Sequence, residues 1–248
     1  MKQIRKITED IYLVDTSIPQ IGYSARHVTL GEEYELVKTF INQISQKRTR
    51  LDGCKILIFL EPQIDSGYPD IVIVKYKPLI HENSKIKSRL TSSHYKVLYE
   101  VDRKKKIGKV FLSRYLGINI QELCKLLRDL ENANLVRLVN ESVYRKAYRD
   151  YFCIKKIIAI EAKIDKWKDA MDQALLNTRF SNESYILMRK DKCRNCYEEK
   201  CREWGIGVFL LNGKMKLHVR PQKNPMPGSY IPFVFNDWIT KIEMMKEN

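Results

Sequence analysis

The sequence predicts an α/β protein in which one sheet-containing domain is interrupted by a small helical domain. Two observations predict this arrangement. Apolar runs with the length of buried strands lie towards both ends of the chain, and a stretch that follows residue 90 has the periodicity of helices. At 248 residues the chain can bury a sizeable core, as one domain or as two.

The first part of the sheet-containing domain begins with a helix. Residues 31–46, GEEYELVKTFINQISQ, place apolar side chains at helical spacing on one stripe. A basic turn leads into KILIFL at residues 55–60, whose length and composition suit a buried strand. A loop with the sequence EPQIDSGYPD follows, and residues 71–76, IVIVKY, predict a second strand.

The middle of the chain predicts a linker and then a helical domain. Residues 79–93 are polar and basic with little periodicity, which is typical of a linker. Apolar side chains then recur at helical spacing in residues 93–103, 109–116 and 119–133. Gly117 suits the end of the second helix, and Asn119 suits the N-terminal cap of the third. The sequence LVRLVNESVYRKAY, which comes next, predicts a two-stranded wing.

This middle segment resembles a winged helix-turn-helix domain. The resemblance implies DNA binding, with the second helix of the turn entering the major groove. The outward face of that helix would carry Gln121, Lys125 and Arg128, residue types that can bond bases or phosphates. Two alternatives stay open, because winged helices also dock other proteins and three short helices can form a simple bundle.

The chain returns to the sheet-containing domain after the wing. CIKKIIAIEAKI predicts a strand that is apolar on both faces, as expected of a central strand covered by helices. A helix, a short strand, a hairpin turning at Asn212 and Gly213, and a last helix from about Phe235 are predicted next. The first of these helices carries on one face Trp167, Ala170, Met171, Ala174, Leu175 and Thr178.

Charged residues stand out where two predicted strands begin or end. Glu61, Asp65 and Asp70 fall within ten residues of one loop. Glu161 and Lys163 are two positions apart on a predicted central strand, so their side chains project from the same side. Because unpaired buried charge is costly, a divalent cation shared by Asp70 and Glu161 would explain both carboxylates. Carboxylate oxygens and few protein ligands suit Mg²⁺.

The order Pro69–Asp70 and then Glu161–Ala162–Lys163 resembles the PD-(D/E)XK signature of restriction-endonuclease-like nucleases. The resemblance implies an α/β fold with a mixed central sheet flanked by helices, and it covers residues 31–77 and 152–210. The helical domain separates the two halves of the signature, which is tolerated where two strand ends lie close together. The predicted parts are a nuclease core at 1–90, the winged helix at 91–149 and the rest of the core at 150–248.

The resemblance also implies metal-dependent hydrolysis of phosphodiester bonds, with Mg²⁺ or Mn²⁺ as the cofactor. Asp70, Glu161 and the backbone carbonyl of Ala162 would hold the metal. Glu61, at the end of its strand, would be a further direct or water-mediated ligand. Lys163 would orient the attacking water or stabilise the charge of the transition state.

Three further residues have more than one interpretation. Gln173 lies on the helix after the second strand, where several branches of this superfamily carry a glutamine; it would position the water, Lys163 or the phosphate, or else pack on the helix flank. Glu33 borders the stripe of the first helix and could face the site, as an N-terminal glutamate does in some relatives. Asp65 is expected to be a turn residue. The structural alternative for the whole set is a salt bridge between Glu161 and Lys163 or a nearby arginine, without a metal.

Cys193, Cys196 and Cys201 form a C-x2-C-x4-C pattern. That is three thiols where a structural zinc ion or an iron–sulfur cluster needs four ligands. Cys153 or His218 would have to complete the set, and the sequence places neither nearby. We therefore expect a loop with reduced cysteines. No nucleotide-binding fingerprint occurs in the chain, so neither ATP nor NAD is implied.

The chain is strongly basic, with 45 Lys and Arg against 30 Asp and Glu and a formal net charge of +15. Positive charge spread along a chain attracts phosphate backbones, although solubility or a membrane-surface preference would also account for it. No apolar run has the length of a transmembrane helix, and the N-terminus lacks the apolar core of a signal peptide. We therefore expect a cytoplasmic protein with no membrane partner.

These observations favour a Mg²⁺-dependent deoxyribonuclease whose inserted winged helix binds or orients duplex DNA, in restriction, phage defence or DNA repair. A homodimer is expected by analogy, because two sites would then address two strands. The main alternative is a non-catalytic DNA-binding regulator or recruitment factor on a decayed nuclease scaffold. A second alternative is an RNA-directed enzyme or a protein-docking winged helix.

Overall fold

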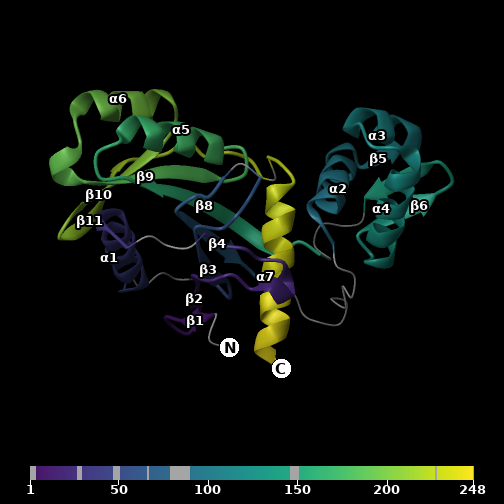
Figure 1. Ribbon diagram of the computed structural model, residues 1–248, viewed down its shortest axis with the longest axis horizontal. Helices are drawn as coiled ribbons and strands as arrows, with labels where there is room; N and C mark the ends of the chain where they lie inside the picture. Colours follow the sequence, from purple (N-terminus) through teal and green to yellow (C-terminus); the bar gives the residue numbers. More distant parts are fainter. Residues whose placement is uncertain are drawn as a thin grey trace. The chain divides into compact units, whose positions relative to one another are not determined.

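The structure is a computed structural model that describes residues 4–26, 30–46, 51–65, 67–78, 90–145, 151–226 and 228–247 (Figure 1). For Asn195, Cys196 and Glu247 it describes the backbone only. Most of the predicted linker, residues 79–89, lies outside this range. The chain forms two compact units, one of Met1–Lys77 and Ile154–Gly228 and the other of Pro78–Cys153 and Ser229–Asn248. No described helix combines the length and the apolar character of a membrane-spanning segment.

The first unit contains an eight-stranded mixed sheet with the order β1-β2-β3-β4-β8-β9-β10-β11 (Figure 1). Strands are parallel in the pairs β2–β3, β8–β9 and β9–β10 and antiparallel in the other pairs. The predicted α/β class with a mixed sheet is therefore confirmed. The strands are β1 (Arg5–Lys6), β2 (Ile11–Val14), β3 (Lys55–Leu60), β4 (Ile71–Tyr76), β8 (Ile154–Ala162), β9 (Glu183–Arg189), β10 (Gly207–Asn212) and β11 (Lys214–Val219).

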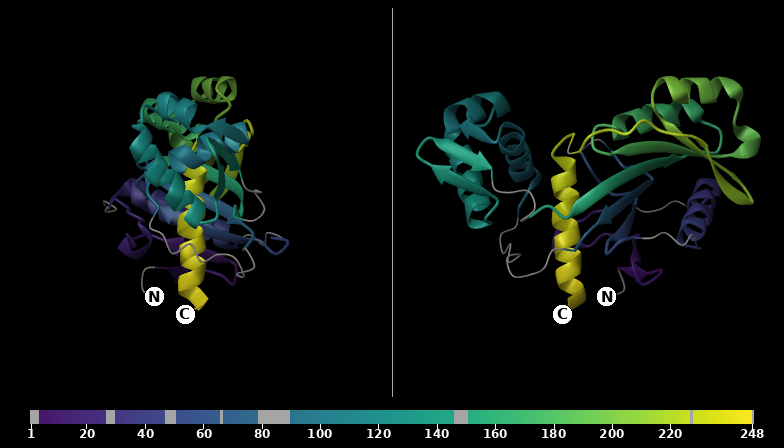
Figure 2. Two further views of the ribbon diagram at one scale, coloured as in Figure 1. Left: turned by 90° about the vertical axis from the view of Figure 1, so that its right-hand side faces the viewer. Right: turned by 180° about the vertical axis from the view of Figure 1, so that it is seen from behind.

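Helices pack on both faces of this sheet (Figures 1 and 2). Successive side chains of a strand point to opposite faces, so β9 contributes to two separate cores. Tyr185 packs in the core that contains the apolar side chains of α1, whereas Ile186 packs in the core of α5 and α6. The helices of this unit are α1 (Glu32–Gln46), α5 (Trp167–Asn177) and α6 (Asn195–Glu203), with short 3₁₀ helices at Pro19–Ile21 and Lys190–Lys192.

Helix α6 corrects the prediction of a cysteine-containing loop. Most of its residues are charged, so its sequence has no apolar repeat that would reveal a helix. Few side chains hold it in place: Cys201 is 1% exposed, and the ring of Tyr197 stacks on Trp167 with centroids 4.2 Å apart. Strands β1 and β2 were not predicted either, because β2 has only four residues; it nevertheless lies inside the sheet, parallel to β3.

The second unit contains a three-stranded antiparallel sheet with the order β5-β7-β6 and helices from two parts of the chain. Gly117 has a φ of 64° after α3, and the side chain of Asn119 accepts a hydrogen bond of 2.8 Å from the backbone N–H of Gln121. The turn therefore has the predicted geometry. The elements are α2 (Ser92–Lys104), β5 (Lys106–Gly108), α3 (Lys109–Leu116), α4 (Ile120–Asn132), β6 (Val136–Val139), β7 (Ser142–Arg145) and α7 (Ile231–Glu247).

The last helix, α7, differs from the prediction in its start and in its packing. It begins at Ile231 rather than near Phe235, because the proline that follows Ile231 is compatible with a first helical turn. It belongs to the second unit, whereas the predicted boundaries place residues 150–248 in the core. The buried amide of Asn236 accepts a bond of 2.7 Å from the N–H of Cys153 and donates one of 2.8 Å to the carbonyl of Tyr151.

We expect Asn236→Ala to lower the free energy of unfolding by about 1–3 kcal/mol, because it removes one hydrogen bond to a buried N–H and one to a buried carbonyl. Asn132→Ala, at the exposed end of α4, removes the same side chain and should change stability by less than about 0.5 kcal/mol. Urea denaturation of the full chain measures both. Equal midpoints for the two variants would show that the two hydrogen bonds of Asn236 do not stabilise the fold.

Candidate active site

Two neighbouring strands bring the predicted catalytic residues together. β4 and β8 are antiparallel, with Ile71 opposite Ile160. Asp70 therefore precedes β4 at the point where β8 ends with Glu161 and Ala162. The backbone N–H of Ala162 donates a hydrogen bond of 2.7 Å to Asp70 Oδ2. The inserted segment that separates the two halves of the signature in sequence does not separate them in space.

The ammonium group of Lys163 lies among oxygen atoms of this site. Its Nζ is 3.3 Å from Asp70 Oδ2 and 3.0 Å from the carbonyl oxygen of Ala162. It is also 3.5 Å from Glu33 Oε2, so α1 does direct its N-terminal glutamate at the site. Burial lowers the pKa of Lys163, but the charges of Asp70, Glu33 and Glu161 outweigh burial and raise the pKa overall. Lys163 is therefore a cation held where several oxygen atoms converge.

Glu161 is the most deeply buried carboxylate of the site, with 2% of its surface exposed. Its Oε1 accepts a bond of 2.6 Å from Asn177 Nδ2, whereas Oε2 is buried and has no hydrogen-bond partner among the described residues. Burial and then the charge of Asp70 raise the pKa of Glu161 to about 8, against the opposing effects of Asn177 and Lys163. A buried acceptor without a donor, beside a second carboxylate, favours a proton or a cation at that point.

Asn177 is the contact that the sequence analysis missed. Gln173, which was predicted to act at the site or to pack on the helix flank, is exposed on α5, and the residue that bonds Glu161 is Asn177, one turn further along the helix. The predicted face of this helix ended at Thr178, whereas the buried residues are Ala170, Met171, Ala174 and Asn177. A polar residue three positions after Ala174 on an apolar stripe was the available signal.

Glu61 lines the same pocket as Asp70, and one of its carboxylate oxygens is bonded to Arg26. The pocket has a volume of about 270 Å³, and Glu33 and Ala162 also line it. Glu61 Oε2 is bonded to Nε of Arg26, and the backbone N–H of Glu61 donates a bond of 3.0 Å to the carbonyl of Asp70. One carboxylate oxygen of Glu61 is therefore bonded to Arg26, and its role as a direct or water-mediated metal ligand stays a prediction. Asp65 lies in a turn, as predicted.

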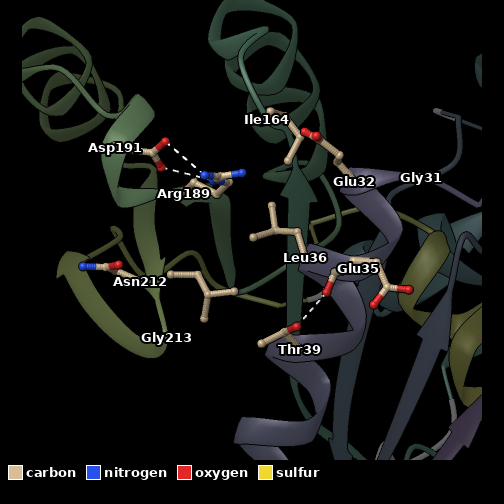
Figure 3. Close-up of a pocket in the computed structure, with 11 residues that line it drawn as sticks. Gly31, Glu32, Glu35, Leu36, Thr39, Ile164, Arg189, Asp191, Asn212 and Gly213 are labelled. Carbon is tan, nitrogen blue, oxygen red and sulfur yellow. Dashed lines mark hydrogen bonds and ion pairs between the residues drawn. The ribbon is translucent and has the colours of Figure 1, made fainter.

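A larger hollow of about 830 Å³ opens between α1 and the β10–β11 turn (Figure 3). Its lining includes Glu32, Glu35 and Ile164 but neither Asp70 nor Glu161. Arg189 projects into it and is bonded to both oxygens of a neighbouring aspartate, at 3.1 and 3.2 Å, so its charge is already paired. The smaller pocket is therefore the one in which the candidate catalytic groups meet.

The residues predicted to contact DNA lie in the second unit, on the exposed side of α4. Gln121, Lys125 and Arg128 are all exposed, whereas the opposite side of the helix is buried. In the small sheet, Tyr144 of β7 lies between two cations on the neighbouring strands. Lys106 Nζ on β5 is 5.1 Å from its ring centroid, and the guanidinium of Arg137 on β6 is 5.3 Å from it. This unit thus exposes positive charge on the helix and on the hairpin.

In the structure, His218 lies near Cys193, one residue of the cysteine pattern, through a shared contact with Glu198. His218 Nε2 lies 2.6 Å from Glu198 Oε1, and that oxygen lies 4.0 Å from Cys193 Sγ. Cys201 is buried near the same place, and burial raises the pKa of its thiol to about 12. Cys153 belongs to the other unit. Across the described part of the chain, no three His, Cys, Asp or Glu side chains form a group that could hold a metal ion.

No protein-family model matches the sequence, and no curated protein matches it significantly.

Without metal, the stability of the protein should depend on pH through Glu161. Its folded pKa is about 8 and its ordinary value 4.5, so between these values the folded protein holds a proton that the unfolded chain has lost. Raising the pH across this window therefore lowers the free energy of unfolding, by up to about 1.4 kcal/mol per pH unit.

Glu161→Gln should remove this part of the pH dependence, and urea denaturation in EDTA at pH 5 to 9 measures it. The difference between wild type and variant cancels the contributions of other groups. Glu203→Gln, on the exposed side of α6, should keep the wild-type profile. Parallel profiles for wild type and Glu161→Gln would show that Glu161 does not titrate in this window.

Proposed function

We propose that the chain is a divalent-metal-dependent deoxyribonuclease of the PD-(D/E)XK, restriction-endonuclease-like type. One observation carries the proposal: two buried carboxylates, Asp70 and Glu161, lie at adjoining strand ends with the Lys163 ammonium beside them. The mixed sheet with helices on both faces agrees with such a fold. Burying two acidic groups and a lysine together costs free energy, so a site at which charge has a chemical use accounts for them better than packing does.

The donor set suits Mg²⁺ or Mn²⁺. Asp70, Glu161 and the carbonyl of Ala162 would hold the ion; the unpartnered Oε2 of Glu161 is a free lone-pair donor, and Lys163 already marks a place where a cation is favourable. Mg²⁺ binds through one or two carboxylates and keeps several waters, so it does not need three acidic side chains. When bound, it would lower the pKa of a water molecule and stabilise negative charge on the phosphate.

The reaction would be hydrolysis of a phosphodiester. A water oxygen forms a bond to phosphorus, one P–O ester bond breaks, and the products are a phosphate monoester and a hydroxyl group. The Lys163 ammonium would face the pentacovalent phosphate and would stabilise the added negative charge. Asn177 would keep Glu161 oriented through Oε1.

The second unit would bind duplex DNA. Its helix–strand–helix–helix–hairpin order matches a winged helix-turn-helix domain, in which α4 would enter the major groove. Exposed Gln121, Lys125 and Arg128 on α4, together with a net charge of +15, support this role. A homodimer in the cytoplasm would place two sites on two strands, in restriction, phage defence or DNA repair.

One observation favours a second candidate, a DNA-binding regulator without catalytic activity. Lys163 Nζ already satisfies Asp70 Oδ2 and the carbonyl of Ala162, so an inactive protein could retain this arrangement as a salt bridge. That candidate requires DNA binding to be unchanged when the site residues are replaced. Competition between duplex DNA, single strands and RNA at one salt concentration would separate both candidates from an RNA-directed enzyme.

The nuclease proposal predicts cleavage of plasmid, linear or branched DNA with Mg²⁺ or Mn²⁺, and loss of cleavage in EDTA. Lys163→Ala should lower the rate by about 10²- to 10³-fold, because it removes one charge at the transition state. Lys216→Ala, at an exposed position of β11, removes the same charge and should leave the rate within about twofold of wild type. No cutting by wild type, with DNA binding intact, would support the regulator instead.

The winged-helix assignment predicts the salt dependence of DNA affinity. Lys125→Ala and Arg128→Ala should each reduce the slope of log affinity against log salt concentration by about 1, because each removes one phosphate contact. Lys104→Ala, at the exposed end of α2, is the matched control and should leave the slope unchanged. If all three variants behave alike, binding depends on net charge and not on the face of α4.

A further inference from the structure

Arg26 is bonded at two points to Glu61, the residue that follows β3. Its backbone N–H donates a bond of 3.0 Å to the carbonyl of Glu61, and its Nε is bonded to Glu61 Oε2. The preceding residue, Ala25, forms an isolated β-bridge with Pro62. The guanidinium therefore has a defined position although Arg26 lies outside the helices and strands of the unit.

The free part of this guanidinium is exposed. The Arg26 side chain is 55% exposed, whereas its partner Glu61 is only 14% exposed. The planar group also lies over the ring of Tyr68, 5.5 Å from the centroid. The two terminal amino groups make no hydrogen bond with any described residue. A guanidinium held at Nε and over a ring keeps two parallel donors for a planar or tetrahedral anion.

These donors lie at the candidate active site. Arg26 lines the pocket of about 270 Å³ together with Asp70 and Ala162, and it is the one cationic side chain among the described residues that line it. It also lines an adjoining hollow of about 390 Å³, which shares Tyr34 and Leu60 with the first. Arg26 thus lines two neighbouring hollows, and Asp70 lines one of them.

We propose that Arg26 binds a backbone phosphate of the nucleic acid strand at this pocket, and that Glu61 positions the guanidinium for that contact. The proposal rests on the proposed function, because it gives the same pocket its substrate contact. A phosphate that approaches Asp70 meets several carboxylates, and a fixed cation with two free donors at the same pocket would help to offset their repulsion. Glu61 then acts through Arg26 and not as a metal ligand, which explains why its carboxylate is turned to Arg26.

The test measures DNA binding separately from cleavage. Affinity for a duplex oligonucleotide is measured with Ca²⁺ in place of Mg²⁺ over a series of salt concentrations. Arg26→Ala should lower the affinity and reduce the salt slope by about 1, as expected for the loss of one phosphate contact. Arg202→Ala, at an exposed position of α6, removes the same charge and should leave both unchanged.

Arg26→Lys separates the charge from the geometry, and it replaces Arg26→Ala if that variant does not fold. A single ammonium group cannot bond Glu61 and also offer two parallel donors. Arg26→Lys should therefore keep the wild-type salt slope but lower the rate of cleavage with Mg²⁺ by at least about tenfold, and Arg26→Ala should lower it by about 10²-fold. Glu61→Gln keeps an acceptor for Nε and should have a smaller effect than either.

The outcomes for the contact and for catalysis can be told apart. If the wild-type protein cuts no DNA and Arg26→Ala still reduces the salt slope of binding, the phosphate contact is upheld and the nuclease is rejected. A wild-type protein that cuts DNA, with Arg26→Ala binding and cutting as Arg202→Ala does, would overturn the phosphate contact and leave the nuclease intact.

Discussion

The hydrogen bond from the Ala162 N–H to Asp70 Oδ2 joins two residues that are 92 positions apart in sequence. It forms because β4 and β8 are antiparallel neighbours, so that the start of β4 lies beside the end of β8. Every other contact of the candidate site depends on this register. A shift of one residue would turn Glu161 to the opposite face and would separate Lys163 from Asp70. The apolar residues of β4 and β8, which are buried on both faces of the sheet, make such a shift costly.

The buried acidic groups of the candidate site lower the stability of the fold. Glu161 Oε2 is buried without a donor, and two carboxylates share a region from which water is largely excluded. The Asn177 amide and the Lys163 ammonium offset part of this cost, but the pKa of Glu161 remains raised. Concentrated charge of this kind is typical of functional sites, where a ligand or a transition state supplies the missing partner.

Much of the fold follows from local sequence, because the information lies in short periodic segments. The central strands and the three helices after residue 90 have clear apolar periods, and their ends are marked by residues such as Gly117 and Asn119. Helix α6 and strand β2 were missed, since a mostly charged helix and a four-residue strand have no readable period. The packing of α7 in the second unit depends on tertiary contacts that no local pattern reports.

Some residues of the candidate site could likewise be predicted from the sequence, and others could not. Glu161 and Lys163 could be predicted because a charged pair at the end of an apolar strand is unusual, and Asp70 because it ends an acidic loop and completes the resemblance to the PD-(D/E)XK signature. Asn177 was missed because the predicted helix face was displaced by one residue at its end, and Gln173 was chosen in its place. Arg26 had no sequence signal: it lies in irregular chain, and its partner Glu61 is 35 positions away. Contacts between a loop and a distant strand end require the three-dimensional arrangement.

The most direct test of the central claim is diffraction from crystals soaked in Mn²⁺, with anomalous data collected to locate the ion. The account predicts an anomalous peak bound by the Asp70 carboxylate, Glu161 Oε2 and the Ala162 carbonyl oxygen, with Lys163 Nζ moved away from that carbonyl. No peak at this place, with Lys163 still bonded to Asp70 and Ala162 at saturating Mn²⁺, would contradict it. The acidic pair would then be a structural ion-pair cluster and not a metal centre.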